Sequence, residues 1–287
     1  MINLAKRNLK IFFREKSAVF FSFLSVLIII GLYVIFLGNI WTNYLPHGTV
    51  GVKTMRDSWI IAGIVSVASV TTAMGAFGRM IEDKVEKISR DFFVSPIRRA
   101  QIVGGYILSA FLIGTILSLF TFVLGEAYIV ATDGEILSLV PMLKFLGTLI
   151  LSAFSSSCFV FFIVSFFERN SAFSTASTVI GTLIGFLTGI YLPIGELPDS
   201  VQWAVKLFPA SHATALMRQL MMEKPMEVSF AGAPASLVTK FKESMGIVYN
   251  YNGYTAEAWV HVLVLVLTGV VFFLLALWNV MRKSKED

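Results

Sequence analysis

Apolar runs of about 20 residues recur along the whole 287-residue sequence, and they decide the fold class. At 1.5 Å per residue, a helix of that length spans the roughly 30 Å hydrocarbon core of a bilayer. Six such runs lie at about 18–37, 59–78, 102–131, 142–167, 172–192 and 259–281. They lack the strict alternation of apolar and polar residues that is typical of outer-membrane barrels. The sequence therefore predicts an all-α membrane protein, with six transmembrane helices in a single domain over residues 1–287.

Composition excludes a soluble globule. Hydrophobic residues make up 56% of the chain and charged residues only 14%, which is too little charge to cover a water-exposed surface. The net charge of +5 does not point to nucleic acid, because the basic residues stand beside apolar runs. Cys158 is the only cysteine, so the sequence allows neither an intrachain disulfide nor a multi-cysteine metal site.

Lysine and arginine are unevenly distributed among the segments between these runs. Fifteen of the 23 basic residues fall in the segments 1–17, 79–99, 168–170 and 282–287. Basic residues concentrate on the cytoplasmic side of membrane proteins. With six spans, these four segments lie on one side of the membrane. We therefore expect a multi-pass protein of the cell membrane with both termini in the cytoplasm.

Residues 1–17 combine apolar and basic side chains at helical spacing. Ile2, Leu9 and Phe12 fall on one side of a helix, and Lys6 and Lys10 fall on the other. This pattern predicts an amphipathic interfacial helix on the inner membrane surface. The alternative is a basic flank of the first span without fixed structure.

The segment 82–96, between the second and third runs, predicts a short cytoplasmic helix. Val85, Ile88 and Phe92 form an apolar stripe, and Glu86 pairs with Arg90 at i,i+4 spacing. A proline closes the segment, since the residue before a proline avoids the helical region. Such a helix suits docking into a groove of a soluble partner, and the alternative is a solvated connector.

The stretch 193–256 carries five of the eight prolines in the chain. Irregular backbone is tolerated at membrane depth only where protein or water satisfies its polar groups. We expect an external segment with two short helices, at about 200–207 and 211–222, that fold partly back into the outer leaflet. Ser211 is the expected N-cap of the second helix.

These two unusual stretches resemble a known family. The segment 92–99 reads Phe-Phe-Val-Ser-Pro-Ile-Arg-Arg and leads into a glycine pair at 104–105, which is similar to the cytoplasmic loop of ABC-2 type permeases. The segments 189–193, Gly-Ile-Tyr-Leu-Pro, and 207–213, Leu-Phe-Pro-Ala-Ser-His-Ala, resemble the end of span five and the external helices of that family. The order and spacing of both motifs agree with the six-span frame of the family.

The resemblance implies the permease subunit of an ATP-driven ABC exporter. Such a subunit forms a homodimer or heterodimer with a second permease chain and pairs with two copies of a separate ATP-binding subunit, which holds ATP and magnesium. No Gly is followed by Lys in the sequence, so it contains no P-loop. We therefore expect no cofactor in this chain. The expected ATPase-coupling residues are Glu82, Val85, Glu86, Ile88, Arg90 and Phe92.

Two other function classes compete with this interpretation. A channel or secondary carrier without an ATPase would require paired inverted repeats with broken helices, whereas the sequence breaks one span only, near Pro193. An embedded enzyme would require a reactive cluster of side chains. The three histidines are far apart in the sequence and no run contains a carboxylate pair, so we expect no catalytic and no metal site.

The candidate pathway residues are Glu126, Phe162, Phe166 and His212. Glu126 falls late in the third run, where a charge is costly unless it is paired or wet. It contacts substrate at the external mouth, or the span ends before it and it meets water. The aromatic side chains would line a pathway for a lipid, drug-like molecule or peptide, or would serve as packing material. His212 would cap or pack an external helix.

Three glycines at intervals of four, Gly181, Gly185 and Gly189, form a small-residue face on the fifth run. Small residues allow close approach of membrane helices. This face is the predicted packing surface of the dimer.

Overall fold

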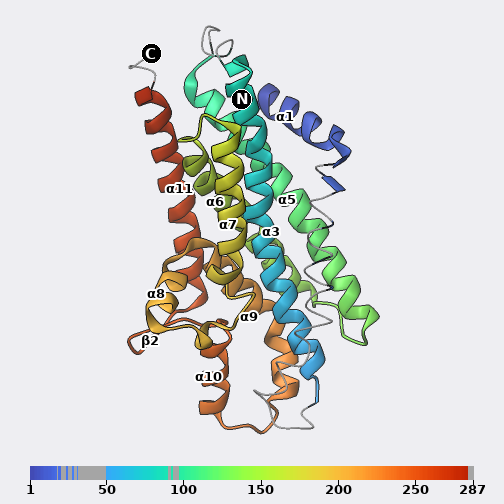
Figure 1. Cartoon of the computed structure of the whole chain (residues 1–287). Coiled ribbons are helices and arrows are strands. Elements are labelled where there is room, and N and C mark those ends of the chain that lie inside the picture. The colour runs from blue at the N-terminus through green and yellow to red at the C-terminus, as the bar shows by residue number, and fades with distance from the viewer. Residues whose placement is uncertain are drawn as a thin grey trace.

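The computed structural model describes residues 1–17, 50–89 and 97–283, together with positions 19, 20, 24, 28, 31 and 92. The described chain is mostly helical, and its long helices run side by side as a bundle (Figure 1). The long helices of the bundle are α3 (Val52–Val85), α5 (Arg99–Ala131), α6 (Leu139–Val164), α7 (Asn170–Leu187) and α11 (Ala258–Lys283).

Within the described residues, four helices are long and apolar enough to cross a membrane, namely α3, α5, α6 and α11. They coincide with four of the predicted spans, and they make the chain a membrane protein. Helix α7 covers most of the predicted fifth span, but it is 18 residues long and its first half is rich in Ser and Thr. The predicted first span, 18–37, lies largely outside the described residues.

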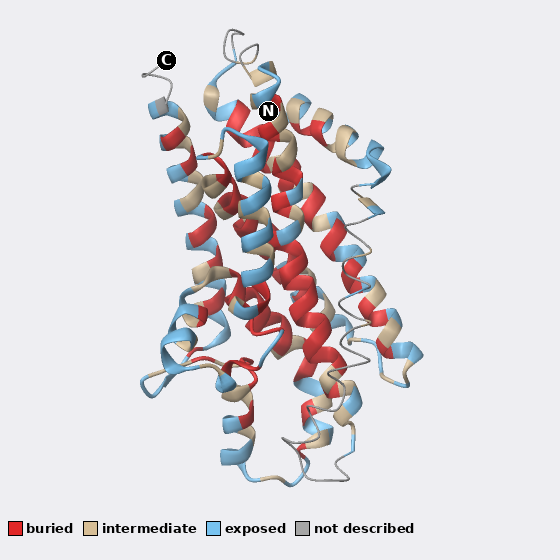
Figure 2. Ribbon diagram, in the orientation of Figure 1, coloured by how far each residue is buried: buried red, intermediate tan, exposed pale blue. Residues whose placement is uncertain are grey.

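Helix α3 is the centre of the bundle. It packs against α5, α6 and α7, and most of its length is buried (Figure 2). A helix that is apolar on all sides belongs in such a position. Several of its polar side chains bond to other helices. The Ser69 Oγ lies 2.9 Å from the Ser152 Oγ and 3.2 Å from the Ser156 Oγ of α6.

One end of the bundle carries α1 (Ile2–Arg14), which lies across α5 (Figure 1). The C-terminal ends of α3 and α11 lie at the same end. Helix α1 falls within the range predicted for an amphipathic helix, and its buried residues, Ala5 and Asn8, face the bundle. The opposite end of the bundle carries α10 (Ala235–Ser244).

The stretch after α7 contains short elements and one longer helix. These are the 3-10 turn η3 (Ile194–Glu196), α8 (Asp199–Leu207), α9 (Pro209–Ser229), α10 and the strands β1 (Asn250–Tyr251) and β2 (Tyr254–Thr255). The strands pair antiparallel, with Tyr251 opposite Tyr254. Asn252 and Gly253 form the turn, with φ of 52° and 94°. An Asn-Gly pair with two positive φ angles is the preferred connection of a two-residue hairpin.

Helix α9 differs from its predicted form. It begins at Pro209, not beside an N-cap at Ser211, because proline has no N–H to leave unsatisfied and its φ suits the first helical turn. The helix also continues through Pro225 to Ser229, since the buried Met222, Met226 and neighbouring residues pack into the core. The first half of α9 is enclosed by α3, α6 and α11, so this part of the stretch 193–256 lies inside the bundle.

Helices α3 and α5 cross closely at Gly125. A Cβ atom built there would overlap the side chain of Ile61, whereas one built at Gly147 of α6 meets nothing within 4 Å. We expect Gly125→Ala to lower the free energy of unfolding by about 1–3 kcal/mol through overpacking. Gly147→Ala, the matched control, should leave it nearly unchanged. Thermal unfolding in detergent measures both, and equal melting temperatures would contradict the crossing.

Candidate functional site

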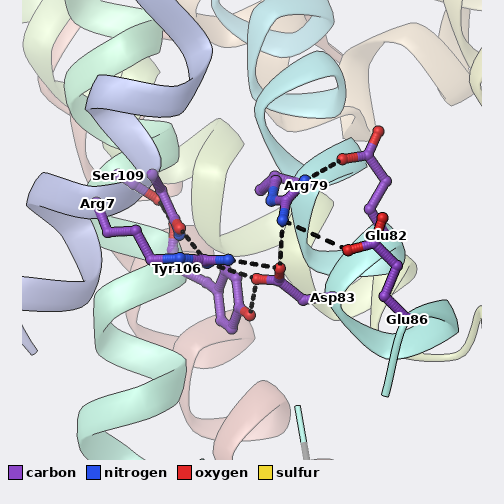
Figure 3. A network of polar contacts seen from close by, with 8 residues as sticks. Arg7, Arg79, Glu82, Asp83, Glu86, Tyr106 and Ser109 are labelled. Atoms are coloured by element: carbon purple, nitrogen blue, oxygen red, sulfur yellow. Dashed lines mark hydrogen bonds and ion pairs between the residues drawn. The ribbon is translucent and has the colours of Figure 1, made fainter. Parts of the chain in front are cut away.

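The most connected polar cluster among the described residues lies where α1, α3 and α5 meet. Asp83 of α3 is fully buried at its centre. Arg7 of α1 donates to both of its oxygens, at 2.7 and 2.8 Å. Tyr106 of α5 donates to the same carboxylate at 2.7 Å, and Arg79 approaches it at 3.1 Å (Figure 3). A buried carboxylate requires such pairing, and the two-pronged Arg7 contact is its strongest form.

The outer side of this cluster carries two glutamates. Arg79 also contacts Glu82 at 2.8 Å and Glu86 at 3.7 Å, and about half of each glutamate side chain remains exposed. Within the cluster two arginines face three carboxylates (Figure 3), and Lys84 and Lys87 of the same stretch balance the remaining negative charge.

Helix α1 lies directly on the glycine pair of α5. A Cβ atom on Gly105 would come within 2.9 Å of Leu4 and 3.1 Å of the Met1 carbonyl oxygen, and one on Gly104 within 2.9 Å of Met1. The absence of side chains at both positions lets the two helices touch. A hydrogen bond of 3.3 Å from Asn8 of α1 to Ser109 of α5 adds to the contact. Gly104 and Gly105 therefore form the surface on which α1 packs.

Two contacts stabilise the positive charge of Arg7. Its hydrogen bond to Asp83 raises the pKa of Arg7 above its usual value, and its guanidinium lies 5.7 Å from the centre of the Phe92 ring. Arg7 thus connects three segments of the chain, namely α1, the end of α3 and the position of Phe92. The paired charges and hydrogen bonds of the Asp83 cluster hold α1, α3 and α5 together. The cluster therefore suits a mechanical link between these helices.

The predicted coupling residues do not all fall on a separate helix. Glu82 and Val85 belong to the last turn of α3, which the contacts from Arg79 at i,i+3 and i,i+4 support. The helix ends at Val85 with Glu86 as its C-cap, and Lys87 has a φ of 65°. The predicted start of the coupling helix at 82 is therefore wrong, because the preceding span extends through it.

The remaining coupling residues are less fully described. Val85 and Glu86 are exposed, whereas Ile88 and Phe92 are half-buried. Arg90 lies outside the described residues, as do positions 91 and 93–96.

A cavity of about 500 Å³ lies between α3 and α7. Its lining is mostly apolar, with four residues that carry a hydroxyl, Thr71, Ser174, Ser177 and Tyr191. Tyr191, just after α7, lines it together with Gly181. Such a surface suits an apolar or amphipathic molecule, since a few placed polar groups in an apolar pocket are typical of small-molecule sites.

Two of the three predicted dimer glycines are used within the chain. A Cβ atom on Gly185 would overlap the ring of Tyr191. Gly189 has a φ of 64° and packs on Ile194. Gly181 alone of the three faces open space. The chain after α7 therefore covers Gly185 and Gly189, and the predicted dimer packing through Gly181, Gly185 and Gly189 stays a prediction.

The four candidate pathway residues lie away from this cavity. Glu126 is buried in α5 and accepts a hydrogen bond of 3.0 Å from the backbone N–H of Leu137, so it fixes the connection to α6. Phe162 packs on Phe166 and on Phe272 of α11, with ring centres 5.1 and 5.4 Å apart. Phe166 itself is exposed.

His212 joins α9 to α11. Its Nδ1 lies 2.8 Å from the Nδ1 of His261, and its Nε2 lies 2.9 Å from the carbonyl oxygen of Lys206. A carbonyl only accepts, so the His212 Nε2 donates. The histidine therefore packs and connects helices, as expected, and the structure shows that His261 is its partner.

Arg218 is a buried residue that sequence reasoning missed. It donates to the carbonyl oxygens of Gly189 at 3.0 Å and Met245 at 3.2 Å, and its guanidinium lies 3.9 Å from the centre of the Trp59 ring. Trp59 also donates to the Met245 oxygen, at 2.8 Å. These contacts tie α3, α9, the end of α7 and the segment after α10. An Arg beside apolar residues in α9 was the available signal.

Among the described residues, no group of three or more His, Cys, Asp or Glu gathers in a way that could hold a metal ion. The acidic residues of the Asp83 cluster are paired with arginines, as described above.

Comparison with known proteins gives two matches. The sequence model of a family described as ABC-2 family transporter protein matches residues 53–278, from the start of α3 to near the end of α11. Nodulation protein J of Bradyrhizobium diazoefficiens is 25% identical over 180 residues. That alignment covers 60% of this chain and 64% of the relative, so the chain spans less than two thirds of the relative's length.

The contact of α1 can be tested by removing Arg7. Arg7→Ala leaves Asp83 with Arg79 and Tyr106, so we expect a loss of about 2 kcal/mol in stability and faster hydrogen exchange in α1. Lys10→Ala removes an equal charge from the exposed side of the same helix and should change neither. Equal exchange rates in the two variants would contradict the role of the ion pair.

Proposed function

The chain belongs to the ABC-2 family of transporter proteins, and we propose that it is the membrane-spanning permease subunit of an ATP-driven exporter. The observation that carries this proposal is the position of the Asp83 cluster. It lies on the helix that also lines the cavity, and its two half-exposed glutamates border the end of the bundle.

Helix α3 connects the two sites directly. Asp83 lies near its C-terminal end, and Thr71 and Met74 of the same helix line the cavity. Nine residues separate Asp83 from Met74, about 14 Å along a helix. A force applied at the cluster would therefore reach the cavity wall through one rigid element.

We infer that a separate ATP-binding subunit docks at this end, against Glu82, Val85 and Glu86. Two copies would serve a dimer of permease chains and would bind ATP and magnesium themselves. This assignment places the α1 end in the cytoplasm, together with both termini, in the cell membrane. Arg7 would then keep α1 and α3 moving as one body during the cycle of ATP hydrolysis.

The cavity between α3 and α7 is the proposed substrate path. Helix α7 buries only Ile184 and Gly185, and its exposed surface carries many hydroxyls. Exposed polar side chains on a membrane helix favour a protein or aqueous neighbour over lipid. A second permease chain against α7 would supply the missing wall. The apolar lining with a few hydroxyls favours export of an amphipathic substrate, such as a lipid, a drug-like molecule or a peptide.

Docking can be tested with a charge at Val85, an exposed residue at the end of α3. Val85→Asp replaces an exposed apolar side chain of the proposed docking surface by a charge, and we expect about a tenfold lower recovery of the ATP-binding subunit when the tagged chain is purified from native membranes. ATPase activity of the complex should fall in parallel. Ile136→Asp places the same change on an exposed residue of the connection between α5 and α6, which lies at the opposite end of the bundle in Figure 1, and serves as the control.

The outcome also separates the function classes. Loss of the partner with Val85→Asp but not with Ile136→Asp supports the permease. Purification of the unchanged chain without any nucleotide-binding partner would instead favour a channel or secondary carrier.

The second chain can be located with a cysteine at Gly181. If α7 borders its equivalent in a homodimer, Gly181→Cys should give a disulfide-linked dimer on mild oxidation in membranes, because such a bond needs Cα atoms within about 7 Å. Cys158 is fully buried and should not cross-link. Leu274→Cys on the exposed face of α11 is the control and should stay monomeric on a denaturing gel. Equal cross-linking of both variants would contradict the interface.

A further inference from the structure

The exposed apolar face of α11 indicates where the hydrocarbon core of the bilayer lies along the bundle. Leu263, Leu267, Val270 and Leu274 recur at helical spacing, and each is at least two-fifths exposed. Only 28% of the apolar stretch of this helix is buried, so its exposed apolar side chains need lipid around them.

Two tryptophans bound this face. Trp259 and Trp278 are both more than half exposed and stand nineteen residues apart, which is about 28 Å along a helix. That distance is close to the roughly 30 Å thickness of the hydrocarbon core. Tryptophan is enriched at both edges of a bilayer, because its ring is apolar and its N–H is polar. Trp259 therefore marks the edge on the side opposite to α1.

A second group of exposed aromatic and apolar side chains continues from Trp259. Trp203 and Leu207 of α8 are 41% and 71% exposed, and Tyr254 of β2 is 51% exposed. In Figure 1, α8 and β2 lie side by side, next to the beginning of α11. Apolar side chains gathered in this way on a protein surface mark an interaction site.

The group is held rigidly at the level of Trp259. Val205 of α8 belongs to one apolar cluster with Ala256, just before α11, and with Val260 at the start of α11. Lys206 donates to the carbonyl oxygen of Asn250 in β1 at 3.0 Å, and its amine lies 5.6 Å from the centre of the Trp203 ring. Because these contacts join α8, the hairpin and α11, the exposed side chains share one depth.

We propose that Trp203, Leu207, Tyr254 and Trp259, the interfacial patch, lie in the headgroup layer of the bilayer leaflet opposite to α1. The occupant of this surface is phospholipid. The patch is continuous with the lipid-facing side of α11, and it combines apolar rings with polar tips, as the Trp259 N–H to Glu257 contact at 3.2 Å illustrates. The proposal does not depend on the proposed transport function.

This depth also separates the patch from the far end of the chain. Helix α10 lies beyond the patch, at the tip of the bundle in Figure 1, so its exposed apolar residue Leu237 should meet water. Leu207 and Leu237 are thus chemically identical exposed residues at different predicted depths.

The test attaches a nitroxide to single cysteines in the full chain, reconstituted in phosphatidylcholine vesicles. The variants are Leu207→Cys, Tyr254→Cys, the water reference Leu237→Cys and the lipid reference Leu274→Cys. Cys158 is fully buried, and the unsubstituted chain should take up no label. Collision with oxygen reports lipid, and collision with a water-soluble nickel chelate reports water. All four positions are exposed, so the substitutions should not disturb folding.

We expect the oxygen-to-nickel ratio at positions 207 and 254 to fall between those of the two references, at least twofold from each. A ratio equal to that at position 237 would overturn the proposal, since the patch would then be in water. A ratio equal to that at position 274 would overturn it too, as would spin–spin broadening at 207 that reveals a second copy of the chain on the patch.

Discussion

No water reaches the hydrocarbon core of a bilayer, so each polar group on a buried helix needs a partner within the protein. Helix α3 meets this constraint at three places along its length. Near one end Asp83 is bound by Arg7 of α1, in the middle Ser69 contacts Ser152 of α6, and near the other end Trp59 donates to the Met245 oxygen. Each pairing fixes a different neighbour, so the contacts that satisfy α3 also position the elements around it.

Hydropathy and its periodicity predicted the long apolar helices and the amphipathic N-terminal helix. Four spans stand where apolar runs were found, and a helix covers most of the amphipathic segment 1–17. Helix α7 is the informative exception among the described spans. Its Ser and Thr side chains lower its hydropathy, although its length of 18 residues would nearly cross the core. A helix that borders the proposed path has reason to be more polar than one that faces lipid.

Contacts between segments that are far apart in the chain could not be predicted from the sequence. Arg7 and Asp83 are 76 residues apart, and charge patterning indicates only local pairs. The spacing of Gly181, Gly185 and Gly189 indicated a close contact but not its partner, which proved to be the chain itself at Gly185. The hairpin was different, because its Asn-Gly turn is a recognised signal that sequence analysis did not use.

The two walls of the cavity are attached to the protein very differently, and this asymmetry has a mechanical consequence. Helix α3 is buried along most of its length and tied to α1 through Arg7, whereas α7 buries only Ile184 and Gly185. A shift of α3 would carry α1 and α5 with it. Tyr106 of α5 donates to Asp83 of α3, and α1 packs on the glycine pair 104–105 of α5. Helix α7 shares few of these contacts and would not follow to the same extent. Under the proposed function, a shift of α3 at the Asp83 cluster would therefore change the width of the cavity, as coupling of the cavity to an ATP-binding subunit would require.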